Sequence, residues 1–234
     1  MRHSDPSKWP IALILLIVAL FGAGCGGKHY LAQYDFSDRT LGLDYIEPPA
    51  PKLLHGYYNL GASVDAMQSV MRAGGAVAKE VEARRASERL DSALRRVNVP
   101  EILAERTVAR ASRYLGTQPV ATPRGADYVL EVDMRSMGID ARYNTAAYLY
   151  TNAEAVLIDR RTGREIWSVR VNGNQRLTPT VHGTEQVPSS IITAGTLAAV
   201  TVQDFQDALE QLVTYSSRLI TDELRDKLRD VRDR

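Results

Sequence analysis

The chain has 234 residues, of which 44% are hydrophobic and 24% are charged, and its formal net charge is +1. This composition is ordinary for a globular protein and excludes wholesale disorder. Nucleic acid binding needs clustered basic groups, which such a balanced chain does not favour, so we expect no nucleic acid partner. The single cysteine excludes an intramolecular disulfide, so packing alone must hold the domain together.

The first 25 residues have the layout of an export signal. Arg2 and Lys8 precede an apolar run at residues 11–21, and the small residues at positions 22–24 lead into Cys25. The apolar run is shorter than the roughly 20 residues that a membrane-spanning helix needs. The sequence therefore predicts an exported protein whose signal peptide comprises residues 1–24.

The segment Gly22-Ala23-Gly24-Cys25 resembles a bacterial lipobox, in which a signal peptidase cuts before the cysteine and the thiol receives a lipid. It departs from the family pattern at Gly22, where a leucine is usual. The resemblance implies that Cys25 is acylated and that the membrane is a partner through this anchor. Two alternatives stay open: the signal remains uncleaved and anchors the chain, or cleavage nearby releases the domain into the periplasm.

The residue after the cysteine carries a further implication of this resemblance. In the enterobacterial sorting scheme an aspartate there retains a lipoprotein in the inner membrane, whereas this chain has Gly26. The resemblance therefore implies an outer-membrane lipoprotein that faces the periplasm, with the inner membrane as the alternative.

The rest of the chain divides into a lipidated tether with an extended segment, residues 25–61, and a periplasmic domain, residues 62–234. Alternating apolar residues between Leu41 and Tyr45 predict a strand, which we expect to be an edge strand. The prolines between positions 48 and 51 block a helix and favour an extended connector.

Helical spacing of apolar residues occurs in three stretches. The first starts at Ser63 and runs to Leu94 across a glycine pair at positions 74–75, and the second runs from Asn98 to Gly116. The last begins at Thr201 and carries the apolar stripe Val202, Phe205, Leu209, Leu212, Leu219, Leu224, Leu228 and Val231.

Strict alternation of apolar and polar residues replaces helical spacing after Gly125. It predicts strands from Tyr128 onward, over residues 146–159 and over residues 165–177, with a hairpin turn that uses Gly163. These strands form a three-stranded antiparallel meander. The expected fold is an α+β two-layer sandwich, in which amphipathic helices pack on an antiparallel sheet of three to four strands.

This layout, from Asn98 to Leu228, resembles the small α/β domains of Gram-negative envelope lipoproteins of the curli-secretion, TolB N-terminal-like and transporter-auxiliary kinds. The residues that carry the resemblance are the strand-turn-strand at positions 155–168 and the closing amphipathic helix. The resemblance implies adaptor or assembly work with envelope proteins, without catalysis. Two alternatives stay open, a transport-auxiliary protein that handles lipid and a periplasmic enzyme.

Few residues are candidates for catalysis or metal binding, so we expect no enzyme, no cofactor and no metal site. None of the four histidines pairs with another at ligand spacing, and Ser189 and Ser190 lack the glycine frame of a nucleophile elbow. Glu131 and Asp133 share a strand face, but Arg135 continues it, which is typical of a solvated sheet surface.

Tyrosines offer the better candidate for a binding surface. Tyr148 and Tyr150 share a strand face, and Tyr143 lies in the turn before it. Tyrosine suits surfaces where an apolar body meets a polar partner, so this patch could bind protein or glycan. The alternative is that Tyr148 and Tyr150 are core residues.

Overall fold

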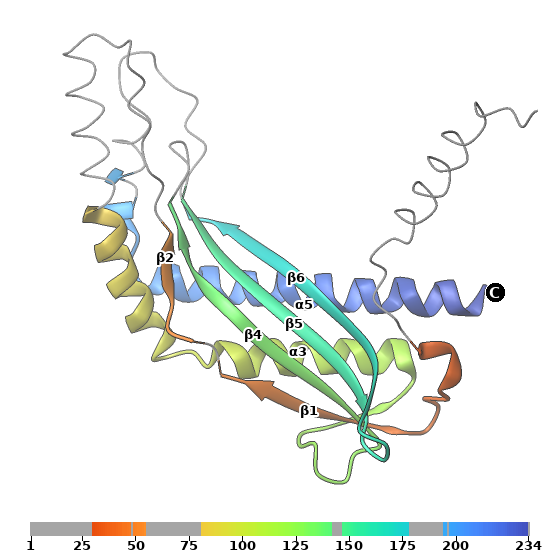
Figure 1. Cartoon of the computed structure of the whole chain (residues 1–234). Coiled ribbons are helices and arrows are strands. Elements are labelled where there is room, and N and C mark those ends of the chain that lie inside the picture. Colours follow the sequence, from red (N-terminus) through yellow and green to blue (C-terminus); the bar gives the residue numbers. More distant parts are fainter. Residues whose placement is uncertain are drawn as a thin grey trace, which may run out of the picture.

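The computed structural model describes residues 30–47, 49–54, 81–141, 147–177, 194–195 and 197–233, and all structural statements concern these ranges. Within them the chain forms a mixed sheet of six strands with helices against one face (Figure 1). The α+β class predicted from the sequence is confirmed. The expected sheet of three to four antiparallel strands is only part of the observed one, because short segments add parallel pairs.

The strands are β1 (Thr40–Ile46), β2 (Lys52–Leu54), β3 (Gln118–Val120), β4 (Tyr128–Asp140), β5 (Tyr148–Asp159) and β6 (Arg164–Arg176). Their order is β3-β1-β4-β5-β6, and β2 pairs with β4 beyond the end of β1. The pairs β4–β5 and β5–β6 are antiparallel, which confirms the predicted meander.

The predicted strand between Leu41 and Tyr45 is β1, but the start of β1 is not an edge. Residues 40–42 pair with β3 on one side, and β1 pairs with β4 on the other, both in parallel. Parallel neighbours require long crossover connections, here through the helices between β1 and β4. Such pairing joins distant segments, so local alternation did not predict it.

The helical segments are η2 (Leu31–Gln33), α3 (Val99–Leu115) and α5 (Val202–Arg232), together with residues 81–94, 194–195 and 197–199. Asn98 caps α3 by accepting a hydrogen bond from the backbone N–H of Glu101 at 3.4 Å, and Gly116 ends it with φ of 76°. Thr201 and Asp204 form a reciprocal capping box at the start of α5. These predicted helix ends are therefore confirmed.

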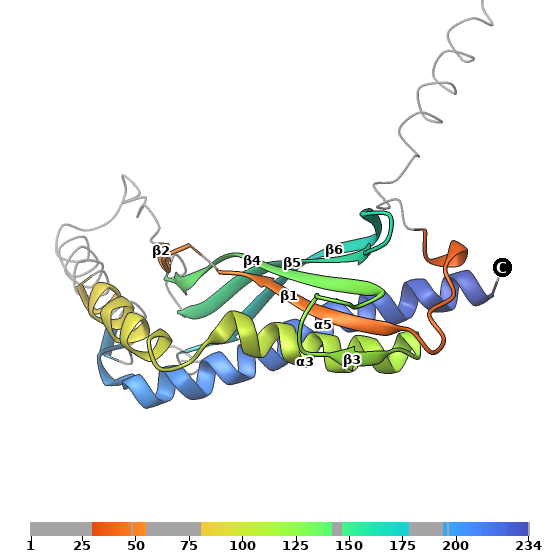
Figure 2. The same ribbon diagram turned by 90° about the horizontal axis from the view of Figure 1, so that it is seen from below.

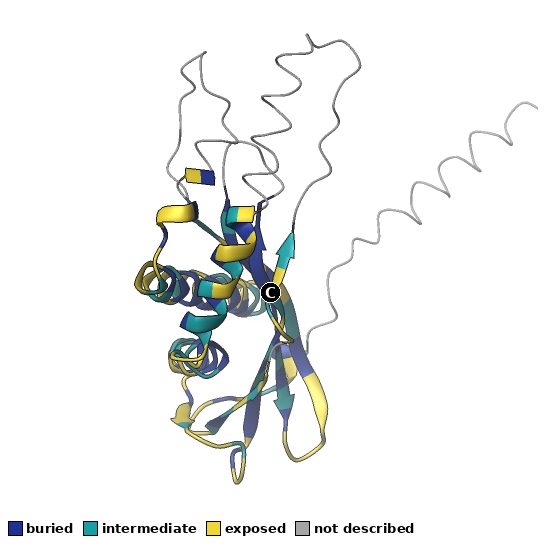
Figure 3. Ribbon diagram, turned by 90° about the vertical axis from the view of Figure 1, so that its left-hand side faces the viewer, coloured by how far each residue is buried: buried dark blue, intermediate teal, exposed yellow. Residues whose placement is uncertain are grey.

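Helices α3 and α5 pack against each other and cover one face of the sheet (Figure 2). Figure 3 shows the buried segments, in dark blue, on strands and helices of both layers. The largest core side chains include Trp167 of β6, which is 2% exposed, and Phe205 of α5, which is fully buried. Within the predicted stripe of α5, Phe205, Leu209, Leu212, Leu224 and Leu228 are buried, and the other three are partly buried.

Several predicted features lie outside the described residues. They are Cys25 with its lipobox-like segment, Ser63, Gly74 and Gly75, the boundary after residue 61, and the serines at 189 and 190. In the part of the chain that is described, no helix combines the length and apolar character needed to cross a bilayer.

Candidate functional site

The proposed tyrosine surface is only partly visible. Tyr143 lies outside the described residues, while Tyr148 and Tyr150 lie on the face of β5 opposite the fully buried Ala147. Tyr148 is half-buried, with the Arg176 guanidinium 5.9 Å from its ring centre, and Tyr150 is 8% exposed. Of this pair, Tyr148 is thus the more accessible side chain, and partner binding stays a prediction.

Glu131 and Asp133, which share a face of β4, lie at a charged network on the sheet face away from the helices. Asp133 accepts an ion pair from Arg135 at 2.7 Å, and Arg135 also donates a hydrogen bond to Glu154 at 3.0 Å. Arg170 of β6 pairs with Glu154 at 3.1 Å. This network spans β4, β5 and β6 and leaves Glu131 beside it.

The pKa values of Glu154, which belongs to this network, and of Glu131, which lies beside it, are shifted in opposite directions. Burial raises the pKa of Glu131, and the like charges of Asp44, its partner in β1, and of Asp133 raise it further. Burial also opposes ionisation of Glu154, but hydrogen bonds from its two arginine partners lower the pKa of that carboxyl overall.

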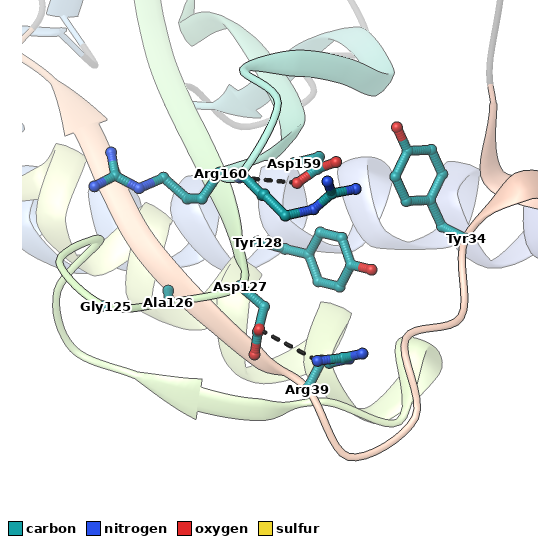
Figure 4. Close-up of a pocket in the computed structure, with 9 residues that line it drawn as sticks. Tyr34, Arg39, Gly125, Ala126, Asp127, Tyr128, Asp159 and Arg160 are labelled. Carbon is teal, nitrogen blue, oxygen red and sulfur yellow. Dashed lines mark hydrogen bonds and ion pairs between the residues drawn. The ribbon is translucent and has the colours of Figure 1, made fainter.

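A pocket of about 490 Å³ lies where the β5–β6 hairpin meets the start of β1 and the loop before β4 (Figure 4). We call it the hairpin pocket. Its lining residues are Tyr34, Arg39, Gly125, Ala126, Asp127, Tyr128, Asp159, Arg160 and Arg161. Three arginines, two aspartates and two tyrosines therefore line one end of the sheet.

Asp127 joins the segments that form the hairpin pocket. Its Oδ2 accepts hydrogen bonds from the backbone N–H and the hydroxyl of Thr40, each at 2.9 Å, and its Oδ1 lies 3.6 Å from Arg39. The hydrogen bonds from Thr40 lower the pKa of Asp127. Its backbone carbonyl accepts a hydrogen bond from the N–H of Arg160 at 3.0 Å, which ties the hairpin to this loop.

Asp159 organises the hairpin turn. One carboxylate oxygen accepts a hydrogen bond from the backbone N–H of Arg161 at 2.9 Å, and the other accepts one from the hydroxyl of Thr162 at 2.7 Å. The Thr162 hydroxyl is the main reason that the pKa of Asp159 is lowered. Within the described ranges, no hydrogen bond or ion pair within 4.0 Å engages the guanidinium groups of Arg160 and Arg161.

Aromatic side chains form the opposite wall of the hairpin pocket. The Tyr34 and Tyr128 rings meet edge to face with centres 6.1 Å apart, and Phe36 lies 4.9 Å from Tyr128. The Tyr128 hydroxyl donates to the carbonyl oxygen of Asp35 at 3.1 Å, while burial raises its pKa. A ligand here would meet cationic and aromatic groups together.

A second hollow of about 440 Å³, the α3 groove, lies between β1, α3 and the segment after β3. Its apolar lining includes Leu43, Tyr45, Val108, Pro119 and Val120. The carboxylates of Asp44, Glu101 and Glu105 also lie on it, so the groove is apolar and acidic.

No metal site emerges from the ranges that the structure describes, since they hold no group of three or more potential ligands. All four histidines lie outside these ranges. Sequence patterns did not predict Arg39, Asp127, Arg160 or Arg161 as site residues. Two adjacent arginines in a predicted hairpin turn, Arg160 and Arg161, were the sequence feature that could have indicated a site. Only the fold brings Arg39 and Asp127 close to them.

No family model matches the chain, and no curated protein matches it. Solved structures that resemble part of it include a candidate lipoprotein from Caulobacter crescentus CB15, with 16% identity over 54% of this chain and 83% of that one and a TM-score of 0.30. XCC0632 from Xanthomonas campestris shows 21% identity over 55% of this chain and 65% of that one, with a TM-score of 0.30. A PelC dodecamer from Paraburkholderia phytofirmans shows 12% identity over 73% of this chain and 89% of that one, with a TM-score of 0.26. No conclusion about this chain follows from similarity at this level, and the likeness to curli-secretion and TolB proteins stays a hypothesis.

Proposed function

We propose that the chain is a non-enzymatic lipoprotein of the bacterial envelope, anchored through acylated Cys25, that acts as an adaptor or assembly subunit. The observation that carries the proposal is the position of the cysteine relative to the fold. The backbone N–H of Tyr30, five residues after Cys25, already donates a hydrogen bond to the carbonyl oxygen of Ile166 at 2.7 Å. A lipid on Cys25 would therefore hold the domain directly at a membrane surface.

Metabolic labelling with a fatty acid tests the anchor. Wild type should take up label and Cys25→Ser should not, because the thiol is the acceptor. Two or more acyl chains hold a protein firmly on a bilayer, whereas one alone binds reversibly. Equal labelling of the two proteins would remove the proposal.

For the location, we propose the outer membrane, with the domain in the periplasm. Gly26 follows the cysteine, and the enterobacterial retention signal would be an aspartate at that position. Separation of the two membranes on a density gradient should place the protein with outer-membrane markers. Recovery with inner-membrane markers would instead favour a role beside an inner-membrane transporter.

The sheet face away from the helices supports the adaptor role. Arg135 and Arg170 on this face have side chains that are 57% and 76% exposed, and both pair with Glu154 at its centre. A photo-cross-linking residue in place of Arg170 should give adducts of defined mass in cells. The same probe in place of Arg113, exposed on α3, is the matched control. Adducts only from the control position would place the partner on the helical layer.

Lipid handling is a second candidate, favoured by the α3 groove. Its volume and apolar lining suit part of a small ligand, although its carboxylates would repel an anionic one. Lipids co-purified with the protein, identified by mass spectrometry, test this candidate. Val108→Arg should abolish co-purification if the groove is the site, and unchanged lipid content would exclude it.

A further inference from the structure

The β5–β6 hairpin lies beside the residue at which the folded domain connects to its proposed anchor. The N–H of Tyr30 binds the carbonyl oxygen of Ile166 in β6, and the Arg164 guanidinium carbon lies 3.7 Å from the centre of the Tyr30 ring. Residues 160–165 of this hairpin are all exposed. The hairpin and the point of attachment thus occupy the same end of the domain.

Chain length limits how far this end can lie from the membrane. Four residues lie between Cys25 and Tyr30, and the five steps from Cα to Cα span at most about 18 Å in an extended chain. The 12 residues of β5 cover about 40 Å. Tyr148, at the other end of the strand, therefore lies at more than twice that maximum span from the hairpin. A lipid on Cys25 therefore brings the hairpin end to the bilayer surface.

We propose that Arg160 and Arg161 bind the phosphate groups of anionic phospholipids in the membrane that holds Cys25. This inference rests on the proposed function, because the anchor sets the distance between hairpin and bilayer. The site is the hairpin pocket, whose lining residues Figure 4 shows, and its ligand is a lipid headgroup in the plane of the membrane.

The chemistry of the hairpin pocket suits a phosphate. Guanidinium groups bind phosphate oxygens through paired N–H donors, and those of Arg160 and Arg161 have no ion pair within the described ranges. The neighbouring carboxylates are already engaged, Asp127 with Thr40 and Arg39, and Asp159 inside the turn. The Arg160 guanidinium can therefore turn outward without first breaking a hydrogen bond or ion pair, whereas the charge of Arg161 also attracts the Asp159 carboxylate.

The aromatic side chains of the hairpin pocket also suit a position at the membrane interface. Tyr34 is half-buried and lines the pocket beside the arginines. Tyrosine is enriched at membrane interfaces because its ring is apolar and its hydroxyl is polar. Attraction of basic groups to an anionic surface acts within about 8 Å at physiological salt. The short connection to Cys25 lets the hairpin arginines come that close to the bilayer surface.

Amide hydrogen exchange of the mature, membrane-extracted protein in lipid nanodiscs tests the proposal. Nanodiscs of phosphatidylcholine alone are compared with nanodiscs that also contain phosphatidylglycerol. Exchange of residues 160–164 should slow several-fold with phosphatidylglycerol, and high salt should reverse the effect. Equal exchange in the two nanodiscs would overturn the proposal, and so would equal slowing by soluble glycerol phosphate.

Variants separate the arginine contact from a general effect on the fold. Arg160→Ser/Arg161→Ser should lose the slowing, and Arg160→Lys/Arg161→Lys should keep only part of it, because lysine retains the charge but not the paired donors. Arg95→Ser/Arg96→Ser is the matched control, because this exposed pair precedes α3, at the end of that helix far from the hairpin. Slowing that persists in the double serine variant at residues 160 and 161 would overturn the assignment.

The intact mass of the same sample distinguishes failure of the anchor from failure of this inference. A mass without acyl chains, together with slowed exchange, would refute lipidation while supporting the headgroup contact near an uncleaved signal. An acylated mass with unchanged exchange would support the anchor and refute the headgroup contact.

Discussion

Gly138 of β4 and Lys52 of β2 are paired so closely that no side chain fits between their backbones. A Cβ atom on Gly138 would overlap the carbonyl oxygen of Lys52 and lie 2.7 Å from its backbone nitrogen. The φ of Gly138 is 155°, which also disfavours other residues. This glycine thus permits β2 to extend the sheet beyond β1.

Gly138→Ala should therefore destabilise the domain by about 2 kcal/mol or more, because both overpacking and backbone strain oppose the alanine. Urea unfolding followed by circular dichroism measures this loss. Gly195→Ala is the control: a Cβ added there meets nothing within 4 Å among the described residues beyond its chain neighbours and its own helix backbone. Because the residue is helical, stability should rise by about 0.4 to 1 kcal/mol. Equal stability of the two variants would contradict the close approach of β2.

Phe205 anchors α5 in the core between the layers, where its side chain is fully buried. Phe205→Ala should lower the free energy of unfolding by about 3 to 5 kcal/mol, since it removes apolar burial and leaves a cavity. Tyr215→Ala, on the same helix but 46% exposed, should change it by about 0.5 kcal/mol or less. Thermal unfolding of both variants separates these cases, and equal losses would mean that α5 does not pack as described.

Glu131 should make the domain less stable as pH rises. Its raised pKa means that the folded state holds a proton more tightly than the unfolded chain, so stability falls as pH climbs through the window between the two values. Glu131→Gln should therefore be more stable than wild type at pH 7, by about a few tenths of a kcal/mol, the size of a cross-strand charge pair. The difference should vanish below about pH 4, where wild type is protonated in both states. A pH-independent difference would point to packing instead of charge.

Asp159 should show the opposite pH dependence. Its pKa is lowered in the folded state, so its contribution is present above the unfolded value and is lost as pH falls through the folded one. Asp159→Ala should lose two hydrogen bonds of the turn and about 1 to 2 kcal/mol near neutral pH. Denaturation across pH tests this, with Glu165→Ala, exposed in the same hairpin, as the control. A loss that did not shrink in acid would contradict the role of the carboxylate.

Local patterns predicted the elements that depend on nearby residues. The alternation after Tyr128 predicted β4, because its side chains face the helices and the solvent in turn. Asn98 and Thr201 predicted helix starts, since a cap needs only residues within one turn. Strands β2 and β3 have three residues each, too few for a periodic signal.

Contacts between residues far apart in the sequence could not be predicted from local patterns. Asp127 and Thr40 lie 87 positions apart and meet only because β1 and β4 pair in parallel. Glu131 and Asp133 drew attention as neighbours on one strand, yet the partners of their network come from three other strands as well as their own. Alternation left Tyr150 open between a surface and a core position, and the structure buries it.

The sequence by itself determined the type and ends of the principal helices and strands, and it predicts the anchor, because caps, turns and signal segments act over a few consecutive residues. Only the tertiary structure decided the parallel pairing of β1 and β2 with β4, since the crossover between them leaves no local trace. It also decided the hairpin pocket, where Arg39, Asp127 and Arg160 converge from separate segments. The reason is physical: burial and pairing of distant segments depend on the whole chain, whereas capping and alternation depend on neighbours.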